Sequence, residues 1–406
     1  MTAALEACGS PWNAAGVAAA GGRRVELFDL TLESDGEEMA GVAFTSADRR
    51  ELAERLDAAG VDRLGLLGAS PMPRADEIAD AAAIRAMNLR TPLFAFTKTA
   101  AEIDLAAELR LTGAVVLIAV NRRFFPLGTT LDDVVDAARG LAKRARSHGL
   151  HTTVMAMDAT RTPAADLERF VAAVAPGVDE LAVADSMGVA SPWGMEALIR
   201  AVRGWTATPL QVHCHDHGAV AVANALAAVR AGADVVHATV NGLGEFAGLA
   251  ALEELAVALP MHLHRRTGID TERLTALSRF VATASGVALP PHKPVTGAGA
   301  FVAPETEEIQ TALIDAAGRG LLEPALTLPP RAVGQRFCLA LGRNCGAHAV
   351  AFVLERHGLR ADPTTLDALA GAVRARLADR HGYALLEEEA LLALVDASGL
   401  PVSPLA

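Results

Sequence analysis

The stretch LQVHCHDHGAVAVANALAAVRAGADVVHAT, residues 210–239, combines two short apolar runs with an amphipathic segment between them. Residues 210–213 and 235–239 are the apolar runs, and each has the length of a buried strand. Residues 221–233 repeat apolar side chains at helical spacing and reach Gly232, where a helix would end. Because parallel strands need a helical crossover of this kind, the stretch predicts an α/β fold with a parallel sheet.

The same alternation of apolar runs and helical segments continues back to residue 25. Helical stretches such as 47–60 and 131–149 separate the expected strands. Those strands are 25–30, 63–67, 92–97, 114–120, 151–156, 180–184, 210–213 and 235–239. Eight such repeats favour a (β/α)8 TIM barrel. An open doubly wound sheet is the alternative, but no GxGxxG motif follows the first strand.

The pattern changes after residue 287. Prolines and glycines between 290 and 299 interrupt regular structure and indicate a connection leaving the barrel. Helical periodicity returns near 306–319, 346–357, 364–381 and 386–398. We therefore expect a flexible tail at 1–22, the barrel at 23–287, a linker subdomain at 288–345 and a small α-rich C-terminal subdomain at 346–406.

Composition narrows the class of protein. Hydrophobic residues make up 51% of the 406 positions, which predicts a folded chain with a large core. The net charge of −12 disfavours a nucleic-acid partner. Four cysteines without CxxC spacing fit a reducing compartment, and no apolar run is long enough to cross a bilayer. We therefore expect a cytoplasmic protein with neither nucleic-acid nor membrane partners.

Polar residues gather where the expected strands end. In a (β/α)8 barrel the chemistry lies at the C-terminal ends of the strands, so this distribution points to a functional site at the barrel mouth. The residues are Asp29, Thr31, Asp35, Glu38, Lys98, Asn121, Arg122, Asp158, Arg161, Asp185, His213, His215, Thr239, Asn241 and Glu245.

The most specific pattern at this mouth is His213-Cys214-His215. In an extended segment residues i and i+2 share one side, so the two imidazoles converge as metal ligands do, while Cys214 packs behind. Asp35 could add a carboxylate, and this set suits Zn, Mn, Fe or Co, and less naturally Mg. A hydrogen-bonded structural pair of histidines is the alternative.

Several segments together resemble the homocitrate synthase, isopropylmalate synthase and hydroxymethylglutaryl-CoA lyase family of metal-dependent barrels. FDLTLESDGEEM (28–39) is similar to the opening FDTTLRDGEQ signature, and the stretch from 211 to 259 is similar to the HxHND and GxGERxGN block. MDATRT (157–162) and DSMG (185–188) match EDATRT and DTxG. PPHKPVTGAGAF (290–301) and AVGQRFCLALGRNCGAHAV (332–350) look like the C-terminal module of the two synthases.

The resemblance implies a TIM barrel in which a divalent metal holds a 2-oxo acid. Acetyl-CoA, or another acyl-CoA, then condenses with the ketone in a Claisen-type acyl transfer. Lys98, Arg161 and Thr239 are the implied substrate-binding residues. A cytoplasmic homodimer acting in amino-acid biosynthesis, or a hetero-oligomer with a related synthase, is the implied assembly.

Carried over residue by residue, the family's site is only partly present. Asp35, His213 and His215 fall on metal ligands, but the fourth ligand position is Leu249, so the metal is expected to be weakly held or absent. The family's remaining catalytic positions are substituted in this chain, so its catalytic residues are unknown. The substituted positions are Ser34, Gly65, Met157, Phe246, Ala303 and Glu308.

The partly retained and partly substituted site leaves three functions open. The first is a condensing acyltransferase of altered specificity or reduced activity. The second is a metal-dependent lyase or aldolase step on the same barrel. The third is a noncatalytic paralogue that binds a ligand or regulates an active synthase.

Overall fold

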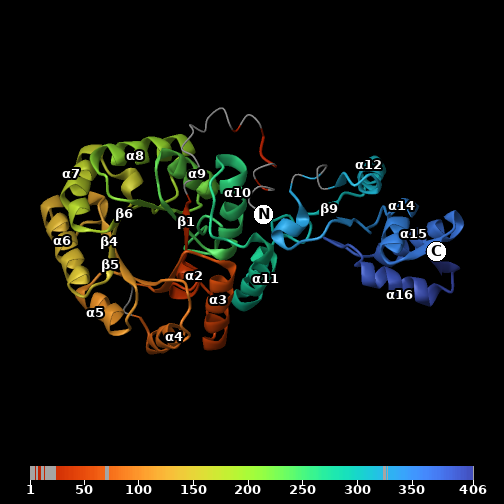
Figure 1. Ribbon diagram of the computed structural model, residues 1–406, viewed down its shortest axis with the longest axis horizontal. Coiled ribbons are helices and arrows are strands. Elements are labelled where there is room, and N and C mark those ends of the chain that lie inside the picture. The colour runs from red at the N-terminus through yellow and green to blue at the C-terminus, as the bar shows by residue number, and fades with distance from the viewer. Residues whose placement is uncertain are drawn as a thin grey trace. The chain divides into compact units, whose positions relative to one another are not determined.

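The protein is described from a computed structural model, which covers residues 5, 8–10, 13, 24–68, 73–322, 326 and 328–405. In this part of the chain, eight parallel strands form a closed barrel in chain order (Figure 1). They are β1 (Glu26–Asp29), β2 (Arg63–Leu67), β3 (Leu93–Thr97), β4 (Gly113–Ala119), β5 (His151–Met157), β6 (Glu180–Asp185), β7 (Leu210–Cys214) and β8 (Val235–Ala238). The predicted (β/α)8 TIM barrel is confirmed, and each strand lies within one or two residues of its predicted bounds.

Helices form a ring around this barrel (Figure 1). Most of them connect one strand to the next, as the sequence pattern predicted. They are α2 (Ser34–Glu38), α3 (Ser46–Ala59), α4 (Ala75–Ala86), α5 (Ala100–Glu108), α6 (Leu131–Ser147), α7 (Ala164–Val174), α8 (Pro192–Trp205), α9 (Ala221–Ala231), α10 (Leu252–Leu263) and α11 (Leu274–Ser285).

Local sequence sets the bounds of these helices. Thr45, Thr99 and Thr130 each begin a helix with a capping box, in which the threonine and an acidic residue three positions later satisfy each other's backbone amides. Gly60 ends α3 at φ +83, and Gly232 ends α9 at φ +116. Both glycines adopt left-handed conformations that other residues reach only with strain.

The barrel interior is filled by side chains that alternate along the strands. Phe28 on β1 packs against Phe94 and Phe96 on β3, with ring centroids 5.1 and 5.8 Å apart. Val115, Met155, Ala182 and Val235 belong to the same buried cluster. These side chains pack the barrel interior, and in barrels of this kind the chemistry lies at the C-terminal ends of the strands.

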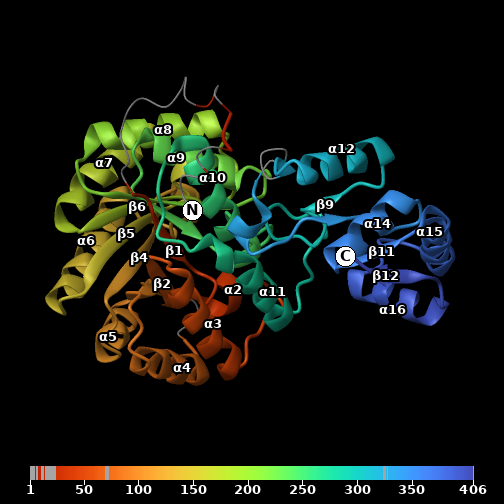
Figure 2. The same cartoon turned by 45° about the vertical axis from the view of Figure 1, so that its right-hand side comes forward.

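Residues 290–293 and 297–406 form a second compact unit, and the first comprises residues 1–289 with 294–296. In the second unit α14 (Ala347–Arg356), α15 (Pro363–Leu377) and α16 (Glu388–Ser398) lie together (Figure 2). The unit also contains α12 (Glu307–Gly318) and two small sheets, β9 (Val302–Ala303) with β10 (Cys338–Leu339) and β11 (Leu359–Ala361) with β12 (Val402–Pro404).

One buried cluster stabilises this second unit. It joins Ala303, Phe337 and Leu339 to Val353 and Leu369 of the helices. Residues on both sides of position 345 therefore share a core, and the proposed subdivision at 345/346, like the boundaries at 22/23 and 287/288, stays a prediction. Most of the predicted tail lies outside the described residues, although Leu5 is buried and Asn13 Nδ2 lies 3.1 Å from His262 Nδ1.

Candidate active site

Several polar residues at the barrel mouth hold the loops together. Asp185, at the end of β6, accepts hydrogen bonds from Thr160 Oγ1 at 2.7 Å and from the amides of Val189 and Ala190 at 3.1 and 3.0 Å. Thr239 is fully buried and donates its hydroxyl to the carbonyl of Leu243. Both residues therefore shape the loops that follow β6 and β8.

The other two residues predicted to bind substrate differ in their surroundings. Arg161 is held by Asp158, whose carboxylate accepts from Nε at 2.8 Å and from Nη2 at 2.9 Å. Asn121 Nδ2 donates to the same carboxylate at 2.7 Å. Lys98 follows β3 with an exposed side chain. Of these two cations, Arg161 is held by a bidentate ion pair, whereas the Lys98 ammonium forms no such pair with the described residues.

His213 and His215 converge as their spacing predicted. Their Nε2 atoms lie 3.0 Å apart, and both side chains are buried. Cys214 between them is buried on the other side of the strand, and burial raises the pKa of its thiol well above the usual range. A thiol in this state is a poor nucleophile, which leaves the imidazoles as the reactive groups of the strand.

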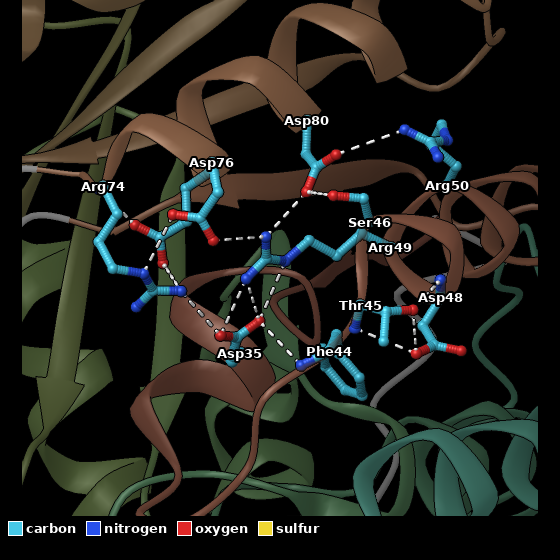
Figure 3. Close-up of polar contacts among 11 residues, drawn as sticks. Asp35, Phe44, Thr45, Ser46, Asp48, Arg49, Arg50, Arg74, Asp76 and Asp80 are labelled. Atoms are coloured by element: carbon cyan, nitrogen blue, oxygen red, sulfur yellow. Dashed lines mark hydrogen bonds and ion pairs between the residues drawn. The ribbon is translucent and has the colours of Figure 1, made fainter.

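Asp35 does not join the two histidines. Arg49 on α3 donates from Nη2 to both Asp35 oxygens at 2.8 and 3.0 Å and from Nε at 3.1 Å, as Figure 3 shows. Arg74 Nη2 adds a contact at 3.1 Å, and Asp80 holds the far side of Arg49 at 2.8 Å. Within the described residues no three histidine, cysteine, aspartate or glutamate side chains come together as a metal site.

The backbone explains where Asp35 points. Ser34 and Asp35 have φ values of +43 and +59, conformations that non-glycine residues rarely adopt. The chain turns sharply at these two residues. The carboxylate then lies against α3, where a buried guanidinium neutralises it.

Leu249 is the second residue, after Asp35, that does not fit a metal site. It forms an isolated antiparallel bridge with His215, so it stands beside the histidines as the family pattern implied. Its side chain is buried in the cluster that contains Phe28 and Phe94, and it has no atom that could bind a cation. With Asp35 paired to Arg49 and an apolar residue at position 249, the residues present do not fit a divalent metal.

Three carboxyl groups gather at the mouth: Glu38 and Glu245, which the sequence placed there, and Glu33, which it did not. Glu38 hydrogen-bonds to Glu245, and burial together with this neighbouring carboxyl raises the pKa of Glu38 to about 7. Burial and the charge of Glu38 also raise the pKa of Glu33 well above its usual range, while Lys98 opposes the shift. Glu38 and Glu245 followed the first and eighth predicted strands, but only their contact distinguishes them from surface residues.

Glu33 occupies space beside two glycines. A Cβ atom on Gly65 would lie 3.5 Å from Glu33 Cβ, and one on Gly68 would lie 2.5 Å from Glu33 Oε1. Gly65, on β2, is one of the substituted family positions. In this chain a buried carboxyl reaches the same neighbourhood from the loop after β1.

The remaining substituted positions are distributed over both units. Met157 ends β5 and packs against the barrel core. Phe246 is exposed on the loop after β8, with its ring 5.3 Å from that of His217. Ala303 lies on β9 and Glu308 on α12, both in the second unit.

The fold and the polar mouth define a (β/α)8 barrel of the kind that carries its chemistry on the loops after its strands. The HMGL-like family model matches residues 24–281, and the chain belongs to this family. The recognition made from the sequence motifs is thereby confirmed.

Three proteins to which the chain is similar are named as synthases. A putative (R)-citramalate synthase of Methanopyrus kandleri is 34% identical over 93% of this chain and 73% of its own length. A homocitrate synthase of the same organism is 33% identical over 88% of each chain. A 2-isopropylmalate synthase of Methanocaldococcus jannaschii is 34% identical over 83% of this chain and 64% of its own length.

Solved structures confirm the fold. The HMG-CoA lyase of Bacillus subtilis superposes with a TM-score of 0.60 at 19% identity, over 66% of this chain and 96% of the lyase. The lyase of Pseudomonas aeruginosa gives a TM-score of 0.57 at 20% identity, over 67% of this chain and 95% of its own. In the described part of the chain, no helix is both long and apolar enough to span a membrane.

Proposed function

We propose that this protein is an acyltransferase that condenses acetyl-CoA or another acyl-CoA with a 2-oxo acid, with altered specificity or reduced activity. The named relatives are synthases of citramalate, isopropylmalate and homocitrate, and they match both units of the chain. The shared chemistry of those products is a hydroxyl and a carboxylate on the carbon that was the ketone. A 2-oxo acid is therefore the substrate class that fits best.

The observation that carries the proposal is the Glu38–Glu245 carboxyl pair. A pKa of about 7 leaves the Glu38 carboxyl partly ionised at neutral pH, which suits a general base. In the proposed reaction the pair removes a proton from the α-carbon of the acyl-CoA. The resulting enolate attacks the ketone carbon, a carbon–carbon bond forms, and the ketone oxygen takes up a proton.

The thioester is then cleaved by water, which releases CoA as its thiol and leaves a second carboxylate. Lys98 supplies positive charge near Glu33 and Glu38, because its charge opposes the raised pKa of both carboxyls. In the proposal Lys98 binds the carboxylate of the 2-oxo acid. No step is assigned to a metal ion, because the residues present do not fit one.

Thiol release from acetyl-CoA across a panel of 2-oxo acids tests the proposal. We expect release with at least one acid, and a decrease in kcat of about 10²-fold or more in Glu245→Gln. Glu51→Gln, on an exposed surface of α3, is the matched control and should keep its activity. Absence of thiol release with every acid would refute the condensation.

A noncatalytic role is the second candidate, and one observation favours it. The Arg49–Asp35 ion pair and Leu249 together replace two of the ligand positions implied by the family. In this role the chain forms a hetero-oligomer with an active synthase, whereas the condensing enzyme is expected to be a homodimer. Wild-type protein that releases no thiol by itself, but changes the rate of thiol release by an added relative, would favour this role over the first. Light scattering should then detect a mixed complex of the two proteins.

A further inference from the structure

A groove lies on the outer wall of the barrel, between α6 and the short 3-10 helix η4 (Ala175–Gly177) that follows α7. α6 and α7 are neighbours in the ring of helices (Figure 1). The groove has a volume of about 750 Å³, which is the size of a small-molecule site, and its lining belongs to the first unit. Gly177 in its wall comes shortly before β6 begins, so the groove reaches the end of the barrel opposite the candidate active site.

Three cations of α6 line this groove. Arg139, Lys143 and Arg146 are exposed, and their spacings of four and three residues place them on one face of the helix over about 10 Å. None of the three forms an ion pair within the described residues, although Arg146 Nη1 donates to the Gly177 carbonyl at 3.2 Å. The groove is thus lined by cations whose charge no acidic side chain of the described chain neutralises through direct contact.

The charge of the groove differs in sign from that of the chain. Asp136 also lines it, so three positive charges and one negative charge leave a net charge of +2, whereas the chain has a net charge of −12. The helix dipole favours cations in the last turn of a helix, which accounts for Arg146 because α6 ends at Ser147. Arg139 lies about two turns earlier, where this effect is small.

Glycines keep both walls of the groove open. Gly140 lies inside α6, where glycine lowers helix stability relative to alanine. A Cβ atom on Gly140 would meet no neighbouring element within 4 Å, and the same holds for Gly177 on the opposite wall. Packing within the chain therefore does not require the missing side chains, and the space is available to a bound molecule.

We propose that this groove binds a small molecule that carries a diphosphate or triphosphate group. Arginine and lysine bind phosphate oxygens through charge-assisted hydrogen bonds, and three cations in a row match linked phosphates better than a single anion. A nucleic acid offers the same phosphates, but the net charge of −12 repels a long polyanion, whereas a small ligand contacts only the groove. This inference does not rest on the proposed condensation.

Calorimetric titration of the full chain with tripolyphosphate and with ATP tests the site. We expect saturable binding of one molecule per chain, tighter for both probes than for citrate, which has similar charge on carboxylates. Tighter binding of ATP than of tripolyphosphate would assign the site to nucleotides, and the reverse order would assign it to inorganic polyphosphate. Absence of saturation with both probes, or citrate binding of equal strength, would overturn the proposal.

Lys143→Gln locates the binding, and Arg144→Gln is its matched control. Arg144 is the next residue of α6 and removal of its charge changes the net charge equally, but its Nε donates to Asp104 at 2.7 Å and it does not line the groove. Lys143→Gln should raise the Kd for tripolyphosphate about tenfold, and Arg144→Gln less than about twofold. Equal increases would mean attraction of an adventitious ion only and would overturn the proposal.

Gly140→Leu tests the groove without a change of charge. Leucine is a strong helix former, so the variant should keep the melting temperature of the wild type, while its side chain occupies the space. We expect tripolyphosphate to bind at least about tenfold more weakly, whereas Gly140→Ala, the smaller control, should bind nearly as the wild type does. Unchanged binding to folded Gly140→Leu would place the anion elsewhere and overturn the proposal.

Discussion

Asp35 matches the aspartate of the family signature, but its surroundings differ from those of a metal ligand. Its sequence position was recognisable, because the DG pair and the preceding apolar strand match the family signature. The direction of its side chain was not, because that depends on two residues with positive φ and on Arg49 from another element. The convergence of His213 and His215 was predictable, since the two-residue period of a strand fixes it.

The Arg49–Asp35 pair should contribute strongly to stability. The two side chains are only 7% exposed, and loss of the Asp35 charge leaves the buried Arg49 guanidinium with Asp80 and Asp76 as its acidic partners. We expect Asp35→Asn to lower the free energy of unfolding by about 1–3 kcal/mol. A double-mutant cycle with Arg49→Met in denaturant should show coupling of about 1 kcal/mol or more. The exposed Arg55–Glu51 pair is the control and should show less than about 0.5 kcal/mol.

Metal binding should be limited by position 249. Cobalt absorption titrations should show weak binding to the wild type, and chelator treatment should leave its melting temperature unchanged. Leu249→Asn places an amide oxygen beside His215, and we expect at least about tenfold tighter cobalt binding. Leu249→Ala removes the leucine without adding a ligand and should stay weak. Stoichiometric tight binding to the wild type that is lost in Asp35→Asn would contradict this view of the site.

Glu38 should make stability depend on pH. Its pKa in the folded protein, about 7, is above the ordinary value of 4.5, so folding favours its protonated form. The stabilisation is complete below about pH 4.5 and is lost as the pH rises through about 7. Glu38→Gln should therefore show a flatter decline of unfolding free energy across this interval than the wild type. Equal slopes in the two proteins would mean that Glu38 titrates normally.

At the scale of elements, the strands were the most predictable part of the molecule. Buried parallel strands are continuous apolar runs, and the prediction placed all eight within two residues of their observed bounds. The irregular segments were less predictable, because contacts between distant elements decide them. Short α2 and the loop after β8 approach each other through Glu38 and Glu245, and nothing local to either segment indicates this pairing.

Helix α3 carries Arg49, which pairs with Asp35 at the candidate site. Its capping box joins Thr45 Oγ1 to the Asp48 amide at 3.1 Å and Asp48 Oδ2 to the Thr45 amide at 3.0 Å. Thr45→Ala should lower the free energy of unfolding by about 1 kcal/mol. Thr45→Ser keeps the hydroxyl and should lose much less. Equal losses in denaturant for both variants would assign the effect to the threonine methyl group.

At the scale of the whole molecule, the chain consists of two compact units with separate buried clusters. Leu369 lies on α15 in the buried cluster of the second unit, and Leu56 lies on α3 in the first unit; both side chains are fully buried. Truncation of either leucine to alanine should cost about 2–5 kcal/mol in its own unit. We expect each unit to unfold on its own, so calorimetry should resolve two transitions, with Leu369→Ala lowering one midpoint and Leu56→Ala the other. If both substitutions lower the midpoint of one common transition by similar amounts, the two units unfold as a single cooperative structure.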